Sequence, residues 1–293
     1  MPEHLVSILV RTRNDEDYIG RTLDALFSQK CDYPFEVIVC DDASEDRTPV
    51  IVATFQNVVT VPRPDGTYMP GRTLNHLVRH SNGDLLVFNN ADAIPQNENY
   101  LTEILRPLLE TDAEAVYANQ LPRPDAQYLV RKDNIRAFGD GRIAAKWRFF
   151  FSMAASAARR ETLVNHPFNE TIRYSEDVEW AYSNKLKIAY AKDALVEHSH
   201  NYTLAQLKKR FYGEGYSDAR IFGTVPSFAR TVMGAGMETL RDWAFLLSNP
   251  AGCCELFTAP IRRWIQKTYY RKGALDYMSA QNGGEAKGRP LDN

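Results

Sequence analysis

The chain has 293 residues, of which 44% are hydrophobic and 25% charged, and its formal net charge is -2. These values are typical of a globular protein and exclude a general electrostatic attraction to nucleic acid. No apolar run approaches the length of a membrane-spanning helix, and the run at residues 5–10 lacks the basic flank and cleavage site of a signal peptide. The four cysteines show neither paired metal-ligand spacing nor a dense disulfide framework, so we expect reduced thiols and a cytoplasmic protein.

Apolar runs and helical periodicity alternate along the first 120 residues. The runs predict strands at residues 5–10, 35–40, 58–61 and 85–88. Helices are predicted after Asn14 and Ser44, which are candidate N-caps, and over residues 72–80 and 99–109. Strands that alternate with helices form parallel sheets, and open parallel sheets bind nucleotides at the carboxyl ends of their strands. This half of the chain is therefore predicted to bind a nucleotide.

The remainder of the chain has a less regular pattern. We expect a loop over residues 120–141, helices over 149–160, 176–186 and 203–211, and short strands at 188–191 and 194–196. From Gly223 the pattern is helical, and the Gly-rich polar residues 281–293 predict a disordered tail. We therefore expect an α/β protein with a catalytic domain over residues 1–222, divided near residue 120 into a nucleotide-binding and an acceptor half (121–222), and a helical extension over 223–280.

Polar side chains follow two of the predicted strands, at the edge where open α/β sheets bind ligands. Asp41 and Asp42 can accept from a nucleobase imide N–H or a ribose hydroxyl, but they suit capping of the next helix equally well. In the triplet Asn90, Ala91 and Asp92, Asp92 offers the hard oxygen that Mg²⁺ or Mn²⁺ requires. A strand-end turn in which Asp92 caps the next helix is the alternative.

Two acids stand at the start of the helix predicted from residue 176. Asp177 is our candidate for the base that deprotonates an acceptor hydroxyl, with Glu176 as a positioning residue. Acids in a first helical turn also complement the helix dipole without any catalytic role. Trp180 can stack on an acceptor sugar, although its helical spacing also suits the core.

Three further side chains are candidate ligands. His198 and His200 have strand-like spacing, so both can lie on one face, and a neutral imidazole can join Asp92 on a metal ion. Ordinary strand-end histidines would have the same spacing. Arg72 can neutralise a phosphate, or it can be a solvated surface charge.

Five segments together resemble family 2 glycosyltransferases of the GT-A fold over roughly residues 5–220: VSILVRTRND, FEVIVCDDASEDRT, GRTLNHLVRHSNGD, VFNNADAIP and SEDVEWA. The resemblance implies a Rossmann-like, mostly parallel central sheet flanked by helices. It also implies donor contacts at Thr12, Arg13, Asn14, Asp41, Asp42, Arg72, Asn90 and Ala91. Asn90 departs from the family, in which many members have an aspartate, so Asp92 is the sole charged residue of its triplet.

Within the family, the segments NADAIP, NQLPRPDA, HPFNE, SEDVEWA and HSHNYTL resemble bacterial rhamnosyltransferase-like members that build cell-surface polysaccharide. This resemblance implies a dTDP-L-rhamnose donor, inversion at the anomeric carbon, and an acceptor hydroxyl on a glycan or lipid-linked saccharide. A UDP-sugar donor is the alternative within the fold. A sugar nucleotidyltransferase and a binding protein without turnover are the alternatives from other classes.

Basic and aromatic residues are mixed over residues 230–271, as they are in helices that lie on a membrane surface. The extension can therefore provide a peripheral contact with the cytoplasmic face of a membrane. Packing of the same helices against the catalytic domain is the alternative.

Overall fold

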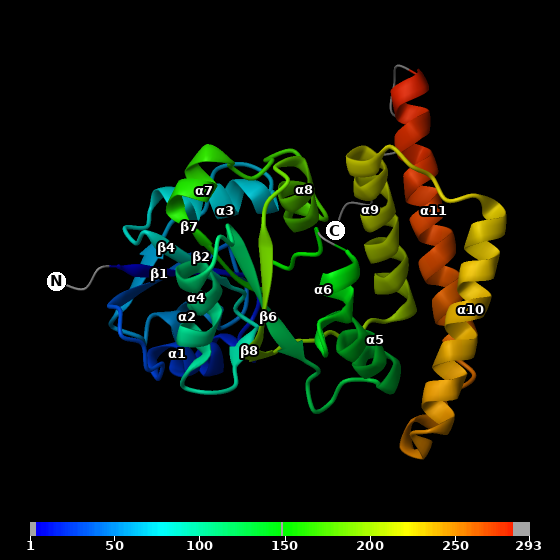
Figure 1. The fold of residues 1–293 in the computed structure, drawn as a ribbon, viewed down its shortest axis with the longest axis horizontal. Helices are drawn as coiled ribbons and strands as arrows, with labels where there is room; N and C mark the ends of the chain where they lie inside the picture. The colour runs from blue at the N-terminus through cyan, green and yellow to red at the C-terminus, as the bar shows by residue number, and fades with distance from the viewer. Residues whose placement is uncertain (1–3, 148, 284–293) are drawn as a thin grey trace. The chain divides into compact units, whose positions relative to one another are not determined.

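A computed structural model describes residues 4–147 and 149–283 (Figure 1). In these residues the strands are β1 (Val6–Thr12), β2 (Phe35–Asp41), β3 (Val58–Val61), β4 (Leu85–Asn89), β5 (Ile94–Pro95), β6 (Ala115–Leu121), β7 (Ala155–Arg159) and β8 (Ile188–Glu197). The helices are α1 (Ile19–Phe27), α2 (Thr48–Val52), α3 (Pro70–Arg79), α4 (Tyr100–Glu110), α5 (Tyr128–Phe138), α6 (Arg142–Lys146), α7 (Arg160–Asn165), α8 (Glu176–Ser183), α9 (Leu204–Phe222), α10 (Phe228–Leu247), the short η1 (Pro250–Glu255) and α11 (Ala259–Gly283).

All of these strands belong to one mixed sheet, in the order β3-β2-β1-β4-β7-β6-β8-β5. The part β3-β2-β1-β4 is parallel throughout. β7 lies antiparallel between β4 and β6, β8 is parallel to β6, and the short β5 is antiparallel to β8. The predicted α/β class is confirmed, and parallel pairing is confined to β3-β2-β1-β4 and β6-β8.

Side chains of the central strands enter two apolar layers, one on each face of the sheet. Ile8 and Val10 of β1 share a layer with apolar residues of α1 and α4, whereas Leu9 shares the other layer with residues of α3 and α8. Every residue of β4, LLVFN, is buried. A strand covered on both faces reads as a continuous apolar run, which is why the sequence pattern located these strands.

The helix predicted over residues 149–160 is wrong, because Ala155–Arg159 form β7. Alanine has the highest intrinsic helix propensity, but tertiary pairing overrides it here. Ala157 enters one apolar layer and Ala158 the other, since β7 is paired on both sides. The pattern also missed β6, and the loop predicted over residues 120–141 contains α5.

The two predicted N-caps are wrong as well. α1 begins at Ile19 and α2 at Thr48, and neither helix has a side-chain cap. Asn14 has a φ of 55° and instead joins two loops: its backbone N–H donates to Ser44 Oγ at 2.8 Å, and its Oδ1 accepts from the Glu45 N–H at 2.8 Å. These contacts tie the loop after β1 to the loop after β2.

The chain divides into two compact units. The first takes in the chain up to Arg123, Asn134–Thr171 and Glu176–Ser199, and it contains the whole sheet. The second takes in Pro124–Asp133, Ile172–Ser175 and the chain from His200 on, and it contains α9, α10 and α11. The domain boundary expected at residue 222 stays a prediction, although α9, which lies before it, belongs to the second unit.

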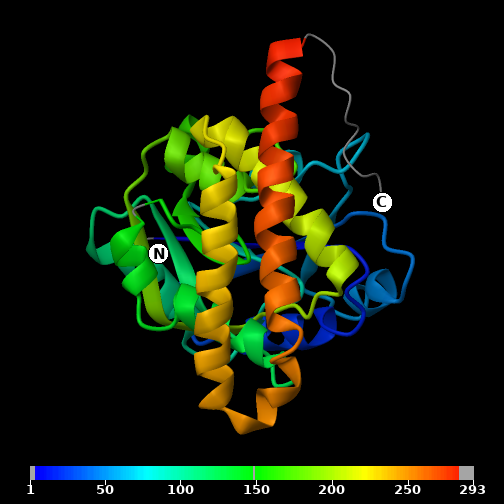
Figure 2. The same ribbon diagram turned by 90° about the vertical axis from the view of Figure 1, so that its right-hand side faces the viewer.

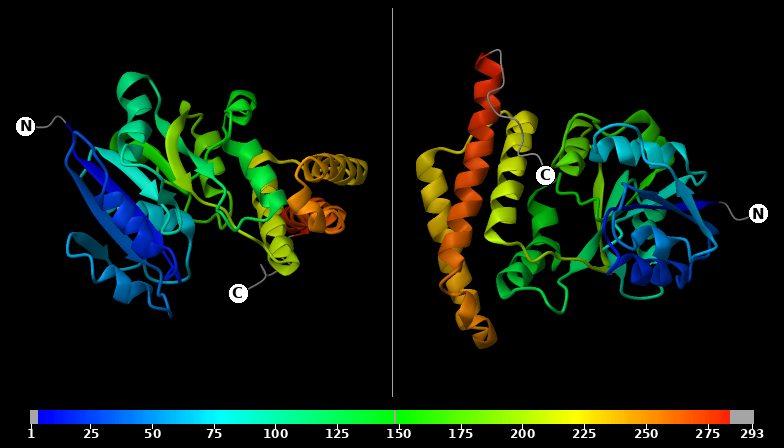
Figure 3. Two further views of the ribbon diagram at one scale, coloured as in Figure 1. Left: turned by 90° about the horizontal axis from the view of Figure 1, so that it is seen from below. Right: turned by 180° about the vertical axis from the view of Figure 1, so that it is seen from behind.

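Helices dominate the second unit, in which α11 lies between α9 and α10 (Figures 2 and 3). A polar cap begins α9, in which the Thr203 hydroxyl accepts from the Gln206 N–H and the Gln206 side chain accepts from the Thr203 N–H. α11 extends to Gly283, past the start of the predicted disordered tail, and residues 284–293 lie outside the described residues. Among the helices of the described chain, none combines the length and apolar character that crossing a bilayer requires.

Glycines allow α9 and α11 to approach closely. A Cβ atom added at Gly273 would lie 2.0 Å from the Tyr212 carbonyl oxygen, whereas one added at Gly236 on α10 would meet nothing within 4 Å. We expect Gly273→Ala to lower the free energy of unfolding by about 1–3 kcal/mol, as overpacking does. Gly236→Ala, the matched control, should raise it by about 0.5–1 kcal/mol because alanine favours a helix. Urea unfolding followed by circular dichroism measures both changes, and equal stability of the two variants would contradict the close packing.

Candidate active site

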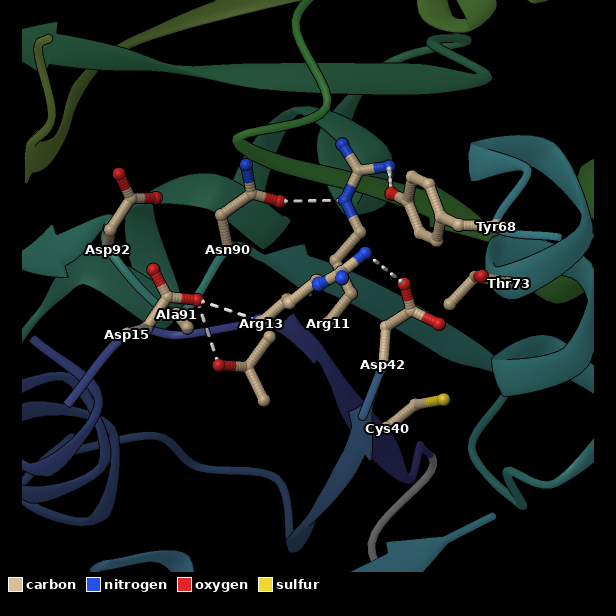
Figure 4. Close-up of a pocket in the computed structure, with 11 residues that line it drawn as sticks. Arg11, Arg13, Asp15, Cys40, Asp42, Tyr68, Thr73, Asn90, Ala91 and Asp92 are labelled. Carbon is tan, nitrogen blue, oxygen red and sulfur yellow. Dashed lines mark hydrogen bonds and ion pairs between the residues drawn. The ribbon is translucent and has the colours of Figure 1, made fainter. Parts of the chain in front are cut away.

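A cavity of about 420 Å³ lies at the carboxyl ends of β1, β2 and β4 in the first unit (Figure 4). It is lined by Arg11, Thr12, Arg13, Asp15, Cys40, Asp42, Tyr68, Thr73, Asn90, Ala91 and Asp92. Adjacent parallel strands end at the same edge of a sheet, which is where open α/β folds bind ligands. The volume falls in the range of small-molecule pockets, about 300–1,000 Å³.

Asp42 forms one end of the cavity. The residue is 7% exposed, and its carboxylate accepts a hydrogen bond from Arg63 Nη1 at 3.2 Å and lies 3.6 Å from Arg13 Nη1. Asp41 has a different role, since its carboxylate accepts from the backbone N–H and the hydroxyl of Ser44. Of the two predicted acids, only Asp42 faces the cavity, and Asp41 holds the loop after β2.

The turn from Asn90 to Asp92 forms the other end. Asn89, at the end of β4, is buried and donates from its amide to the carbonyl oxygens of Asn90 at 3.0 Å and Ala93 at 2.8 Å. Its Oδ1 accepts from the Tyr100 hydroxyl at 3.0 Å. These buried hydrogen bonds fix the turn and so fix where the side chains of Asn90 and Asp92 point.

Asp92 and His198 are close enough to share a metal ion. His198 Nε2 lies 3.5 Å from Asp92 Oδ1, and His198 Nδ1 lies 2.8 Å from Gln120 Oε1. Because a carbonyl oxygen only accepts, Nδ1 carries the proton and Nε2 keeps its lone pair towards Asp92, which is the usual outer-shell arrangement around a metal-ligating histidine. One carboxylate oxygen and one imidazole nitrogen fit a divalent cation whose other positions are filled by water and substrate oxygens. His200 stands two residues further along the chain, in the second unit.

Arg123 orients Asp92 and was not among the predicted site residues, although the segment NQLPRPDA contains it. Arg123 Nη2 donates to Asp92 Oδ2 at 3.1 Å and to the Asp92 carbonyl oxygen at 2.7 Å. The guanidinium is buried and lies 4.0 Å from the centre of the Tyr18 ring. Since Oδ2 is held by Arg123, Oδ1 is the oxygen that faces His198.

The two predicted catalytic acids are partly or fully enclosed. Glu176 is buried, and its Oε1 accepts from Arg11 Nη1 at 3.1 Å. The Asp177 carboxylate accepts from the backbone N–H groups of Val178 at 2.8 Å and Met153 at 3.3 Å. Burial, and next the negative charge of Glu176, raise the pKa of Asp177 to about 7. A carboxylate with that pKa can take up a proton near neutral pH.

Other predicted donor contacts differ in position. The Thr12 hydroxyl, in the cavity wall, donates to Asp15 Oδ2 at 2.8 Å. Arg72 is not part of the wall, because its side chain donates to the Asp65 carbonyl oxygen and lies 3.8 Å from Glu170. Asn14 is also absent from the wall, since it ties the two loops together as described above. These positions place Arg72 and Asn14 outside the cavity wall, and their expected donor contacts stay predictions.

Trp180 is a core residue. It is 1% exposed, packs against Phe151 and Phe168, and donates from Nε1 to the His166 carbonyl oxygen at 2.5 Å. No face of its ring is open to a sugar, so the expected acceptor contact is corrected.

Cys40 is buried in the cavity wall, and burial raises the pKa of its thiol to about 11, which excludes a thiolate nucleophile near neutral pH.

Comparisons with known proteins give consistent similarities. The model of glycosyl transferase family 2 matches residues 7–175. The O-antigen chain rhamnosyltransferase WbaN of Salmonella anatum is 31% identical over 242 residues, which cover 76% of this chain and 75% of that protein. The O-antigen chain rhamnosyltransferase RfbN of Salmonella typhimurium is 26% identical over 262 residues, which cover 83% and 82%.

Solved structures of glycosyltransferases share the fold. The mannosyltransferase PcManGT from Pyrobaculum calidifontis, solved with GDP-Man and Mn2+, superposes with a TM-score of 0.63 at 19% identity over 94% of this chain and 87% of that one. Glucosyl-3-phosphoglycerate synthase from Mycobacterium tuberculosis, solved with Mn2+, UDP and glucosyl-3-phosphoglycerate, has a TM-score of 0.55 at 21% identity over 77% and 82%. At these identities the likeness shows the fold.

The hydrogen bond between Gln120 and His198 makes metal affinity testable. We expect Gln120→Leu to weaken Mn²⁺ binding about 10- to 100-fold, because the imidazole loses the acceptor that fixes its tautomer. Calorimetric titration of Mn²⁺ into the protein measures the change. Gln56→Leu, at an exposed glutamine, is the control and should bind as the wild type does. If Gln120→Leu bound Mn²⁺ with wild-type affinity, the assignment of His198 as a metal ligand would be rejected.

Proposed function

Because the chain belongs to glycosyltransferase family 2, we propose that its cavity binds a nucleotide-sugar donor, dTDP-L-rhamnose, and that the sugar is transferred with inversion to a hydroxyl of a glycan or lipid-linked saccharide. Similarity to two O-antigen chain rhamnosyltransferases along most of both chains supports this donor and acceptor class. One observation carries the proposal: Glu176, the neighbour of Asp177 in the chain, accepts a hydrogen bond from Arg11, which lines the cavity.

Each end of the cavity is assigned one part of the donor. Asp42 accepts a hydrogen bond from the base imide or a ribose hydroxyl, as acids after strands do in nucleotide-binding sheets. Asn90 and Ala91 face the diphosphate, and the Asn90 amide can bond a ribose hydroxyl or a metal-bound water. Asp92 with His198 or His200 would hold a Mg²⁺ or Mn²⁺ ion, which when bound neutralises the diphosphate leaving group.

Asp177 acts as the base in a single displacement. It accepts the proton of the acceptor hydroxyl while the acceptor oxygen forms a bond to the anomeric carbon. On the opposite side, the bond from that carbon to the diphosphate oxygen breaks, and its electron pair leaves with the nucleoside diphosphate. Glu176 positions this helix end by its ion pair with Arg11.

Replacing the base tests the proposal. We expect Asp177→Asn to lower kcat for transfer about 10²- to 10⁴-fold, the usual contribution of a general base, while dTDP binds as in the wild type. In the wild type, kcat/KM should fall tenfold per pH unit below about pH 7, because protonated Asp177 cannot accept a proton. The measurements are transfer from dTDP-L-rhamnose across pH and calorimetric titration of dTDP.

Glu179→Gln on the same helix is the control and should leave transfer unchanged, because Glu179 accepts hydrogen bonds from Asn169 and Ser183 and has no assigned role in the reaction. Full transfer by Asp177→Asn would reject the assignment of the base. Transfer from a UDP-sugar alone would keep the mechanism and change the donor. Release of pyrophosphate from a nucleoside triphosphate would identify a nucleotidyltransferase, and nucleotide binding without any transfer would identify a binding protein.

The second unit offers a surface for a membrane. Exposed apolar side chains follow one another along α10: Phe228, Met233, Met237, Leu240 and Leu247. Asp242 on the same helix is 0% exposed and accepts from Arg263 at 2.6 Å, so its charge faces the interior. Arg230 and Arg241 remain exposed. An apolar stripe with cationic neighbours fits the headgroup region of an anionic bilayer, where a lipid-linked acceptor would be found.

Charge inserted into this stripe should prevent lipid binding. We expect Met237→Glu combined with Leu240→Glu to abolish co-sedimentation with phosphatidylglycerol vesicles, which the wild type should show. Val164→Glu on α7 is the control, because Val164 is similarly exposed at 64% but lies on another helix. Absence of wild-type binding to these vesicles would reject the contact. A wild-type dimer that the double variant dissociates would show that a second copy covers the stripe.

A further inference from the structure

Arg11 lies at the centre of the cavity, between its two ends. In Figure 4 its guanidinium stands between Asn90 and Tyr68, with Asp42 to one side and Asp92 to the other. Nε donates to Asn90 Oδ1 at 3.0 Å, and Nη1 donates to Glu176 Oε1 at 3.1 Å and Tyr68 Oη at 3.4 Å. Nη2 makes no hydrogen bond to any residue that the structure describes. The guanidinium is therefore held through Nε and Nη1, and Nη2 has no partner among the described residues.

The ion pairs around the cavity distinguish Arg11 from the other arginines. Asp42 is matched by Arg13 and Arg63, and Asp92 is matched by Arg123. Those cations are committed to carboxylates of the cavity wall. Arg11 pairs with Glu176, which is not part of the wall, and its neighbour in the wall is the neutral amide of Asn90. Of the arginines paired here, Arg11 is thus the one that lines the wall while its carboxylate partner lies outside it.

The affinity of Arg11 for an anion depends on the side chain at residue 90. A carboxylate at residue 90, 3.0 Å from Arg11 Nε, would place a second negative charge beside the guanidinium, in addition to that of Glu176, and would repel an anion. The amide holds the guanidinium by the same hydrogen bond and adds no negative charge. The planar arginine fork suits phosphate oxygens, and charge-assisted hydrogen bonds are about twice as strong as neutral ones.

We propose that Arg11 binds the diphosphate of the donor directly through Nη2, so that the chain itself supplies part of the charge neutralisation that the Asn90 triplet lacks. The proposal rests on the proposed function, since it assumes that a nucleoside diphosphate occupies the cavity. It assigns to Arg11 a contact with the leaving group in addition to its contact with Glu176. The diphosphate should accordingly retain affinity for the protein when no divalent cation is present.

The test compares dTDP with thymidine in EDTA, by calorimetric titration of the full chain. We expect Arg11→Met to weaken dTDP binding at least tenfold and to leave thymidine binding unchanged, because only dTDP carries phosphate. Arg13→Met should weaken both ligands by the same factor, because Arg13 contacts Asp42 at the base end. Arg79→Met, at an exposed arginine outside the cavity wall, should change neither.

A second variant keeps the test valid if Arg11→Met does not fold. Asn90→Asp should weaken dTDP binding in EDTA at least tenfold, because the added carboxylate bonds Arg11 and repels the diphosphate, and it should leave thymidine binding unchanged. Wild-type dTDP affinity in Arg11→Met, or in Asn90→Asp, would overturn the proposal and leave Arg11 as a positioning residue for Glu176. A wild type that binds neither dTDP nor UDP, with or without Mn²⁺, would instead reject the proposed function itself.

Discussion

The position of β1 between β2 and β4 determines where the cavity forms. Leu9 is level with Phe88, and Thr12 is level with Asp41 in the parallel pairing. Two residues beyond Leu9 and Phe88, the chain places Arg11 beside Asn90, and their side chains meet at 3.0 Å. A slip of one residue would turn Arg11 to the other face of the sheet. The apolar run of β1, buried in two layers, prevents that slip and thereby fixes the polar site at its end.

Charged side chains gather at the same edge of the sheet, where they form ion pairs. Asp92 is held by buried Arg123, and Glu176 by Arg11. Removing one member of such a pair would leave an uncompensated charge in a region of low polarity, which is strongly destabilising. Asp15 shows the effect of burial without an ion pair in the described residues, since burial raises the pKa of its carboxyl. The paired side chains hold a cavity already shaped for a ligand that carries charge.

The strands of the first half could be predicted because each is buried on both faces and reads as an apolar run. Asp42, Asn90 and Asp92 followed from those strands, because residues after parallel strands meet at one edge. β7 could not be predicted, since its alanines favour a helix locally and become a strand only between β4 and β6. Arg123 was missed for a related reason: its contact with Asp92 joins residues 31 positions apart, which no local pattern records.

For residues on helices, the sequence predicted the correct segment of the chain but not which side of the helix faces the cavity. Successive residues of an α-helix differ by about 100° around its axis. Thr73 lines the cavity while Arg72, its neighbour on α3, points to Glu170. Trp180 follows Asp177 by one helical turn, yet it lies in the core against Phe168. The sequence could identify the helix near the site but not which of its faces the cavity would meet.

Arg11 connects the two halves of the proposed reaction. Burial and the charge of Glu176 raise the pKa of Asp177, while hydrogen bonds from Val178 and Met153 and the charge of Arg11 lower it. A lysine at residue 11 would keep the charge but lose the planar fork that reaches Asn90, Glu176 and the open cavity at once. The requirement for arginine is therefore geometric as well as electrostatic. One guanidinium can face the leaving group and steady the helix end that carries the base only because its nitrogens point in different, fixed directions.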